Sequence, residues 1–136
     1  MVNSAIGKSA HSINVLILDD QHEVLFENLR LLEEAMQRGE GAAEVPKILD
    51  NLAELKNYHF PTEERLMQTY EYPLRDSHAI EHHAFFEHFR KMSSLVSEGD
   101  RTVAIQLVDL LYHWLENHVM NWDARLGEYL NDRGVT

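Results

Sequence analysis

Five histidines and two acidic residues fall into four short clusters, and each cluster lies at one end of an apolar helical stripe. The clusters are His22; His59 with Glu63; His78 with His82; and His118 with Asp123. Residues four apart on an α-helix are separated by about 40° around the axis, so the two members of the second cluster, and likewise of the third, can reach one point in space. Seven nitrogen and oxygen ligands that converge inside a bundle would form a metal site with room for two ions.

Capping residues, glycines and prolines divide the chain into four expected helices, over about 19–37, 46–72, 76–98 and 100–130. Asp19 or Asp20 can cap the first helix, and Pro46 suits the first turn of the second. The length of 136 residues fits one compact domain. We therefore expect a single domain, with an N-terminal arm over residues 1–18 and a bundle over about 19–131.

The polar clusters alternate in their position along the four expected helices. They come at the start of the first and third helices, before the apolar stripe, and toward the end of the second and fourth. Short loops make neighbouring helices antiparallel, so in an up-down-up-down bundle all four clusters lie near one end. The expected fold is all-α, an antiparallel four-helix bundle, with leucines and phenylalanines filling the other end.

The charge balance and the lack of cysteine limit the partners and the metal ligands that this chain can have. The 23 acidic residues against 12 basic ones disfavour nucleic acid as a partner, because phosphate contacts need clustered Lys and Arg. Without cysteine, imidazole and carboxylate must hold any metal, a donor set that suits iron, manganese or zinc. No apolar run approaches the ~20 residues of a membrane span, and no secretory signal is evident. We expect a cytoplasmic protein without membrane insertion, and a monomer, since no long exposed apolar face indicates an obligate oligomer.

Two local details leave the geometry of the clusters open. Pro61 lies inside the second cluster and cannot donate to the carbonyl of Asn57, so it should kink or loosen the second helix, or aim the neighbouring carboxylate. His118 and Asp123 are five apart, about 140° around an ideal helix, so they cannot share a narrow stripe but can flank an ion pair from two sides. Spacing alone therefore does not decide whether Asp123 is a ligand.

Four motifs together resemble those of the hemerythrins, specifically the bacterial single-domain type. They are Asp19-Asp20-Gln21-His22; His59-Phe60-Pro61-Thr62-Glu63-Glu64; His78 with His82 and Phe85; and Trp114-Leu115-Glu116-Asn117-His118 with Asp123. One HxxxH pair is common, but four clusters in this order within about residues 18–130 are specific. The resemblance implies the hemerythrin four-helix bundle.

The N-terminal lead-in departs from the usual hemerythrin pattern. A tryptophan-containing segment is common there, and His11 to Leu18 stands in its place. The alternation of Ile13, Val15 and Ile17 fits a short strand or an extended arm. Because no partner strand is evident, we expect the arm.

The resemblance implies a role for each member of the clusters. The implied holders of the first iron are His78, His82 and His118. Those of the second iron are His22 and His59, and the implied bridges are Glu63 and Asp123, beside an oxygen atom. The second iron then keeps an open position, at which the family binds dioxygen reversibly. The implied cofactor is an oxo- or hydroxo-bridged pair of iron ions, with dioxygen as the ligand and no substrate turned over.

The donor types agree with this implication. Five histidines with two carboxylates differ from the glutamate-rich sites of ferritin-like oxidases, whose two ExxH motifs have no counterpart here. A site with few nearby acids and bases cannot easily protonate reduced oxygen, which favours reversible binding over oxidation chemistry. We hypothesise that Leu25, Leu115 and Val119 help to keep the oxygen pocket dry.

Several functions fit such a chain. The first is a dioxygen carrier, store or delivery protein rather than an enzyme, because the bundle fills the chain and leaves no output domain. Such a protein could deliver oxygen to a protein partner that the sequence does not identify. The alternatives are a di-iron redox enzyme (an oxidase, a peroxidase or a nitric oxide scavenger) and an oxygen or iron sensor that acts through a partner. The lack of a His-Asp dipeptide disfavours an HD-type phosphohydrolase, and a phosphotransfer bundle would need only one exposed histidine.

The remaining polar residues are interpreted as ordinary surface or packing groups. A lone histidine on a helix is more often a packed or surface residue than a ligand, and this applies to His11, His83, His88 and His113. Glu64 and Glu81 are interpreted as solvated charges. For the seven residues of the four clusters, a structural role without metal is disfavoured, because the burial of so many unpaired polar groups would be costly in free energy.

Overall fold

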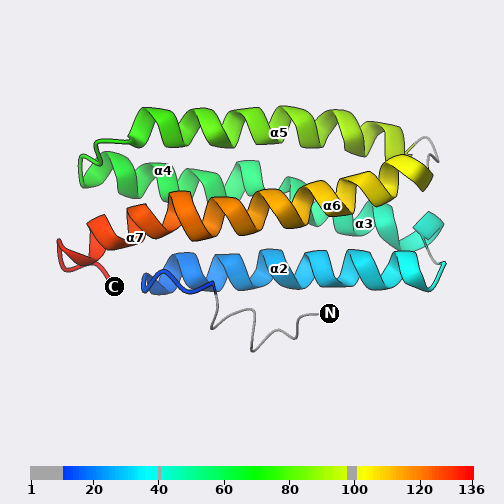
Figure 1. Cartoon of the computed structure of the whole chain (residues 1–136), viewed down its shortest axis with the longest axis horizontal. Helices are drawn as coiled ribbons and strands as arrows, with labels where there is room; N and C mark the ends of the chain where they lie inside the picture. Colours follow the sequence, from blue (N-terminus) through cyan, green and yellow to red (C-terminus); the bar gives the residue numbers. More distant parts are fainter. Residues whose placement is uncertain (1–10, 40, 98–100) are drawn as a thin grey trace.

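The chain forms four antiparallel helical rods, as the all-α prediction requires. The computed structural model describes residues 11–39, 41–97 and 101–136. The first rod is α2 (Leu16–Gln37) and the third is α5 (Arg75–Ser97). The second rod consists of α3 (Gly41–Ala53), the π-helical turn η1 (Leu55–His59) and α4 (Phe60–Thr69), and the fourth of α6 (Arg101–Asn117), the π-helical turn η2 (His118–Asp123) and α7 (Ala124–Asn131). The predicted four-helix bundle is confirmed (Figure 1).

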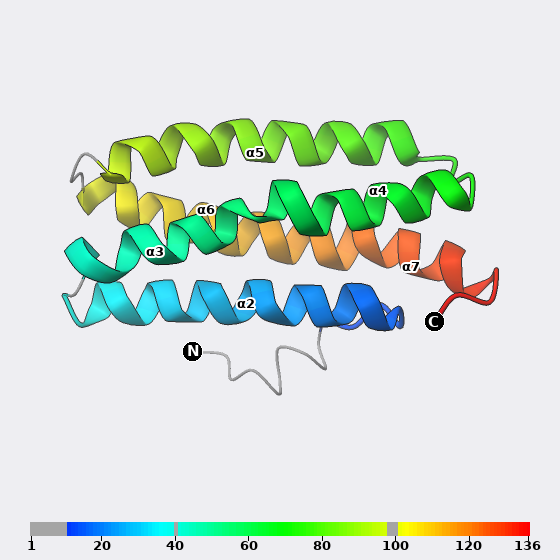
Figure 2. The same cartoon turned by 180° about the vertical axis from the view of Figure 1, so that it is seen from behind.

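The rods are ordered so that the polar clusters fall at one end. In Figures 1 and 2, the starts of α2 and α5 lie at the same end of the bundle as α4 and α7. The opposite end holds the start of α6 and the whole of α3. This arrangement follows from short connections between antiparallel neighbours.

The first helix begins earlier than predicted. The carbonyl of Val15 accepts hydrogen bonds from the backbone N–H groups of Leu18 and Asp19, so the helix starts at Leu16 and the expected boundary at residue 19 is wrong. The Asp19 carboxylate instead accepts hydrogen bonds from the backbone N–H of Ile13 (2.8 Å) and from the hydroxyl of Ser12 (2.7 Å). The same carboxylate that predicts a helix cap thus holds the lead-in segment against the first turn.

The second rod also begins earlier than predicted. Its helix starts at Gly41, so Pro46 lies inside α3 instead of in its first turn. Proline lacks a backbone N–H, so it removes one hydrogen bond from this helix, in its second turn.

The buried apolar side chains form two clusters. The larger fills the end away from the polar clusters with leucines and phenylalanines, among them Leu29, Leu52, Phe85, Phe89 and Leu111. The smaller closes the polar end, and its members are Ile13, Val15, Leu18, Met67, Tyr72, Val119, Leu126 and Leu130. The predicted N-terminal arm is therefore partly core: Ile13 and Val15 are buried before the first helix begins.

A close backbone contact ties this lead-in to the last helix. A Cβ atom added to Gly127 would lie 2.5 Å from the carbonyl oxygen of Ile13 and 2.9 Å from its Cβ. Both distances are shorter than packed atoms accept, so only glycine allows the lead-in to lie on α7.

Replacement of Gly127 by alanine should therefore reverse the usual effect of such a change. Inside a helix, alanine is more stable than glycine by about 0.5–1 kcal/mol. Here we expect a loss of about 1–3 kcal/mol, because the lead-in must shift. Thermal unfolding of Gly127→Ala measures the effect, and Glu128→Ala on the exposed side of α7 is the control. A Gly127→Ala protein that melts above the unchanged protein would contradict the contact.

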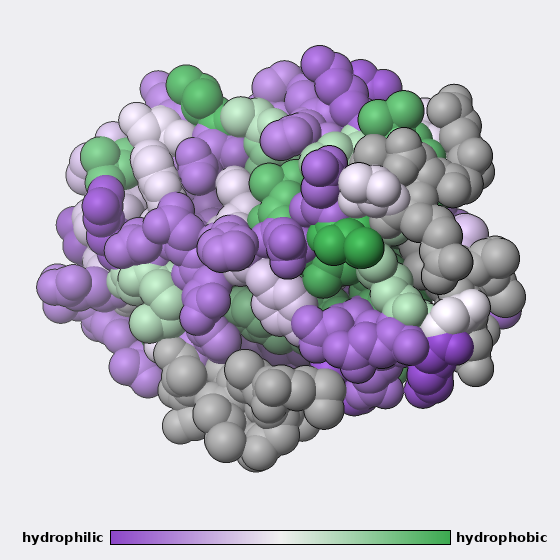
Figure 3. Space-filling view, turned by 45° about the vertical axis from the view of Figure 1, so that its right-hand side comes forward, coloured by the Kyte–Doolittle hydropathy of each residue, from purple (hydrophilic) through white to green (hydrophobic). Residues whose placement is uncertain are grey.

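One face of the molecule is largely polar. In Figure 3, hydrophilic residues cover most of the visible face and the hydrophobic residues form separate smaller areas. Among the helices of the described residues, none combines the length and the apolar character needed to cross a membrane.

Candidate metal centre

The seven side chains of the sequence-predicted clusters meet inside the bundle. His22 lies in the second turn of α2, while His78 and His82 lie near the start of α5. The second rod contributes His59 and Glu63, and the fourth rod contributes His118 and Asp123. Each of these seven residues is at most 3% exposed. Every rod therefore sends at least one polar side chain to the same buried point.

Three histidines gather on one side of the two carboxylates. The Nε2 atoms of His78 and His82 lie 3.0 Å and 2.9 Å from Oε1 of Glu63. The Nε2 atoms of His78 and His118 each lie 3.0 Å from Oδ1 of Asp123. The three nitrogens are also close to one another, since His118 Nε2 lies 3.2 Å from that of His78 and 3.1 Å from that of His82.

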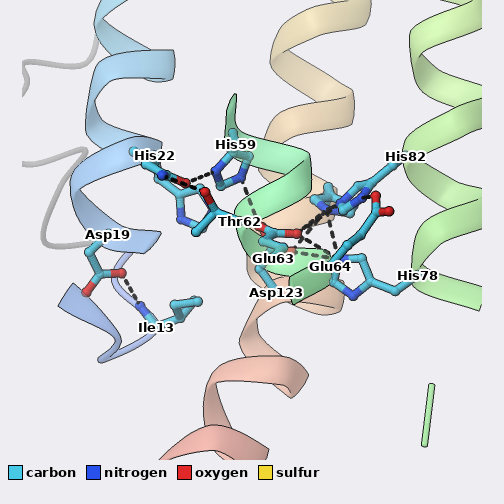
Figure 4. A network of polar contacts seen from close by, with 12 residues as sticks. Ile13, Asp19, His22, His59, Thr62, Glu63, Glu64, His78, His82 and Asp123 are labelled. Atoms are coloured by element: carbon cyan, nitrogen blue, oxygen red, sulfur yellow. Dashed lines mark hydrogen bonds and ion pairs between the residues drawn. The ribbon is translucent and has the colours of Figure 1, made fainter. Parts of the chain in front are cut away.

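Two histidines face the other oxygens of the same carboxylates. Nε2 of His59 lies 2.8 Å from Oε2 of Glu63, and Nε2 of His22 lies 2.9 Å from Oδ2 of Asp123. Figure 4 shows Glu63 and Asp123 between His22 and His59 on one side and the α5 histidines on the other. Each carboxylate thus presents one oxygen to a group of three imidazoles and one oxygen to a group of two.

The π-helical turn η2 explains how Asp123 joins this arrangement. Side chains five residues apart on an α-helix are separated by about 140° around the axis, so spacing alone does not decide whether Asp123 is a ligand. A π-helix closes its turn between residues i and i+5, so the first and last members of such a turn face the same way. His118 and Asp123 are the first and last residues of η2.

A second π-helical turn lies where Pro61 was expected to disturb the second rod. Proline cannot donate a hydrogen bond to the preceding turn, and η1 ends at His59, two residues before Pro61. Pro61 itself then stands in the first turn of α4, where its missing N–H costs nothing. The expected local loosening is present, and it ends one helical turn before Glu63.

The donor atoms fit two metal ions. One group consists of Glu63, His78, His82, His118 and Asp123, and the other of His22, His59, Glu63 and Asp123. Two ligands about 2.1 Å from one ion and at right angles are about 3 Å apart, the spacing seen among the Nε2 atoms. Both oxygens of Asp123 lie near imidazole nitrogens, but neither has a well-aligned hydrogen-bond partner among the described residues. Buried carboxylate oxygens left in this way are suited to a cation.

Without metal, the cluster is held together by charge. Burial alone would lower the pKa of His22, but the carboxylates of Asp123 and Glu63 outweigh it and raise this pKa to about 9. The same opposition raises the pKa of His118 to about 10. Burial would raise the pKa of Glu63, but the surrounding histidines, His59 first, lower it well below its usual value. At neutral pH, the metal-free cluster therefore carries imidazolium cations beside two carboxylates.

Metal uptake should consequently release protons. His22 and His118 are protonated at neutral pH in the metal-free protein, and an imidazole nitrogen must lose its proton before it binds a metal. We expect the apparent affinity for ferrous iron to rise from neutral pH toward about 9 to 10 and then to level off. Anaerobic iron titrations over this range, with a pH indicator, measure both quantities. An affinity independent of pH would contradict the charged metal-free cluster.

Comparison with known proteins agrees with the geometry. The family model described as the hemerythrin HHE cation binding domain matches residues 14–130. The chain belongs to the hemerythrin family. A bacteriohemerythrin of Pseudomonas paraeruginosa (strain DSM 24068 / PA7) is 31% identical over 110 residues, which are 81% of this chain and 71% of that protein. A bacteriohemerythrin of Clostridium acetobutylicum is 25% identical over 130 residues, which are 93% of this chain and 98% of that protein.

Aromatic rings pack against the hemerythrin histidines. Phe60 stacks on His82 with ring centroids 3.9 Å apart, and Trp114 stacks on His118 at 4.3 Å. Trp122 and Tyr72 contact His78 edge-on, at 5.7 Å and 6.5 Å. These rings limit the orientations that the imidazoles can adopt. Phe60 and Trp114 belong to the motifs of the sequence analysis, whereas Trp122 and Tyr72 do not.

Two polar contacts beyond the seven residues were missed by sequence reasoning. Nδ1 of His82 donates to Oε2 of Glu64 at 2.9 Å, so the interpretation of Glu64 as a solvated charge was wrong in part, although its side chain is 43% exposed. Nδ1 of His59 lies 2.7 Å from Oε1 of Gln21. Gln21 lies within a quoted motif, but periodicity gives no reason to single it out.

The residues hypothesised to keep the oxygen pocket dry are all buried. Leu25 and Leu115 belong to the larger apolar cluster and Val119 to the smaller one. His83, His88 and His113 are exposed, and His11 stacks on Phe26 with ring centroids 4.2 Å apart. None of these four histidines is a member of the two metal-binding groups found among the described residues.

Proposed function

We propose that this hemerythrin-family chain binds dioxygen reversibly at a di-iron centre, as a carrier, store or delivery protein. The observation that carries the proposal is the shared pair of carboxylates, each with one oxygen toward three imidazoles and the other toward two. A pair of iron ions supplies, when bound, two electrons and an open coordination position for dioxygen.

The residues have unequal roles in this proposal. In this proposal, His78, His82 and His118 would hold one ion, and His22 and His59 would hold the other. Glu63 and Asp123 would be shared between the two ions and would offset their charge. The ion held by only two imidazoles would have fewer protein ligands, so dioxygen would bind there.

The surroundings of the two ions favour binding over turnover. Leu25, Leu115 and Val119 are at most 6% exposed and carry no proton to donate. The only carboxylates in the two metal-binding groups of the described residues are the bridges themselves. With no further acid or base in these groups, protonation of reduced oxygen would be slow, which favours the release of dioxygen over turnover. We therefore propose a binding protein and not an enzyme.

The proposal extends to a cytoplasmic, monomeric protein with an unidentified delivery partner. Sedimentation velocity of the iron-loaded protein tests the monomer directly. A concentration-dependent dimer would replace that part of the proposal without affecting the metal centre.

The decisive experiment is a visible absorption spectrum of the iron-loaded protein through repeated oxygen cycles. The protein is reduced without oxygen, exposed to oxygen and then purged with inert gas. We expect two irons per chain and a colour that appears with oxygen and disappears on purging. Rapid irreversible conversion to the ferric form would favour a di-iron redox enzyme or a sensor instead. Failure to bind iron would refute the proposal.

A further inference from the structure

Gln21 connects the first rod to the second through its side-chain amide. Its Nε2 lies 3.1 Å from the hydroxyl oxygen of Thr62, and that hydroxyl donates to the carbonyl of Tyr58 at 2.8 Å. Its Oε1 lies 2.7 Å from Nδ1 of His59. A continuous chain of three hydrogen bonds therefore runs from the π-helical turn η1 to the back of one imidazole.

The direction of every bond in this chain is determined by its first member. The backbone carbonyl of Tyr58 can only accept, so the single proton of the Thr62 hydroxyl is used there. Thr62 must then accept from the amide nitrogen of Gln21, which leaves the amide oxygen of Gln21 facing His59. Nδ1 of His59 must be the donor to that oxygen, and the lone pair of a neutral ring is then on Nε2, the atom beside Glu63.

His59 differs in this respect from most of the cluster. In the part of the chain that the structure describes, the Nδ1 atoms of His22, His78 and His118 have no hydrogen-bond partner, and that of His82 donates to the half-exposed carboxylate of Glu64. Within the two-imidazole group, His59 therefore has its outer nitrogen bound to a described protein group and His22 does not. Thr62 is 6% exposed, so water does not easily replace its part of the chain.

We propose that Gln21, supported by Thr62, is a positioning residue that fixes the His59 imidazole in the tautomer able to bind metal through Nε2. The proposal rests on the proposed di-iron function. It states that the neutral amide of Gln21 controls the metal affinity of the site that contains His22 and His59. Partners of this kind, one step beyond the ligands, typically change metal affinity by about 10- to 100-fold when removed. A neutral acceptor also forms a weaker hydrogen bond with the Nδ1 proton than a carboxylate would. The imidazole is then a weaker electron donor to a metal ion bound at Nε2.

The first test reads the hydrogen bond from Nδ1 of His59 to Gln21 in the metal-free protein by NMR of the histidine ring protons. We expect a slowly exchanging Nδ1–H of His59 in the unchanged protein and its loss in Gln21→Leu and Thr62→Val. The matched controls are Gln106→Leu and Thr69→Val, the same changes at exposed helical positions. Equal exchange of this proton in the unchanged protein and both test variants would overturn the proposal.

The second test measures ferrous iron binding against a competing chelator and the midpoint potential of the loaded protein. Gln21→Leu should weaken the second iron by about 10- to 100-fold while the first stays bound. Gln21→Glu restores an acceptor, so it should recover the affinity and lower the midpoint potential, a combination that a merely structural role would not produce. An unchanged potential in Gln21→Glu, or equal affinities in Gln21→Leu and Gln106→Leu, would overturn the proposal.

These outcomes separate the present inference from the proposed function. If the unchanged protein fails to bind two irons, the di-iron function is wrong, whereas the NMR result still tests the hydrogen bond that positions His59. If the unchanged protein binds two irons and the Gln21 variants behave like their controls, only the inference on Gln21 is wrong.

Discussion

Replacement of His118 by alanine is expected to leave one iron per chain and no reversible binding of dioxygen. Nε2 of His118 lies 3.0 Å from Asp123 and within 3.2 Å of the Nε2 atoms of both α5 histidines, so its loss removes one of three imidazoles from the same point. An ion held by the two remaining imidazoles and the shared carboxylates binds more weakly, and a single iron cannot supply both electrons. Iron analysis and the oxygen-cycled spectrum measure the two effects.

His113→Ala is the matched control for this change. His113 lies on α6, five residues earlier on the same rod, and its side chain is exposed with Nδ1 against the carbonyl of Asp109. We expect two irons and an unchanged oxygen spectrum in this control. Equal iron content in His118→Ala and His113→Ala would refute the assignment of His118 to the centre.

Replacement of Val119 by aspartate should convert reversible binding into rapid oxidation. Val119 is completely buried next to His118, and the proposal places it in the dry oxygen pocket. A carboxyl group buried there would be held largely protonated and could supply a proton to reduced oxygen. A positioned acid typically accelerates proton transfer by about 10²- to 10⁴-fold, so we expect the ferric form to accumulate at least about 100-fold faster. The loss of the oxygen-dependent colour with time gives this rate.

The adjacent position provides the control. Met120 is 45% exposed, so Met120→Asp adds the same acid one residue away but outside the bundle. We expect its oxidation rate to match that of the unchanged protein. Because a buried aspartate also destabilises the fold, thermal unfolding and iron content of Val119→Asp are measured alongside. A folded, iron-loaded Val119→Asp protein with an unchanged oxidation rate would refute the pocket assignment.

The arrangement of the rods could be predicted because it depends on long, repetitive signals. The apolar stripes extend over several turns, and the alternation of polar clusters between helix starts and helix ends follows from antiparallel order alone. His22 and His78, at helix starts, and His59 and His118, late in their rods, are brought together as that order requires. Many residues contribute to such a signal, so an error of a few residues at a boundary does not change it.

The local geometry of the centre could not be predicted because it departs from the ideal helix. Periodicity assumes 3.6 residues per turn, and the π-helical turn η2 breaks that assumption at the point where Asp123 joins the cluster. The contact between Gln21 and His59 depends on how two rods face each other, and neither residue indicates it alone. The first helix begins at Leu16, and Asp19 binds the lead-in instead of capping the helix, two uses of one carboxylate that local capping rules do not distinguish.

The origin of the seven side chains from all four rods bears on the order of assembly. No two or three neighbouring rods supply every donor, so a partly assembled bundle offers an incomplete set. Iron would then bind only after the rods have packed together. The bound iron would link residues that are far apart along the chain. Its main influence would fall on how slowly the bundle comes open, because contacts that form after the folding barrier are the ones that govern unfolding.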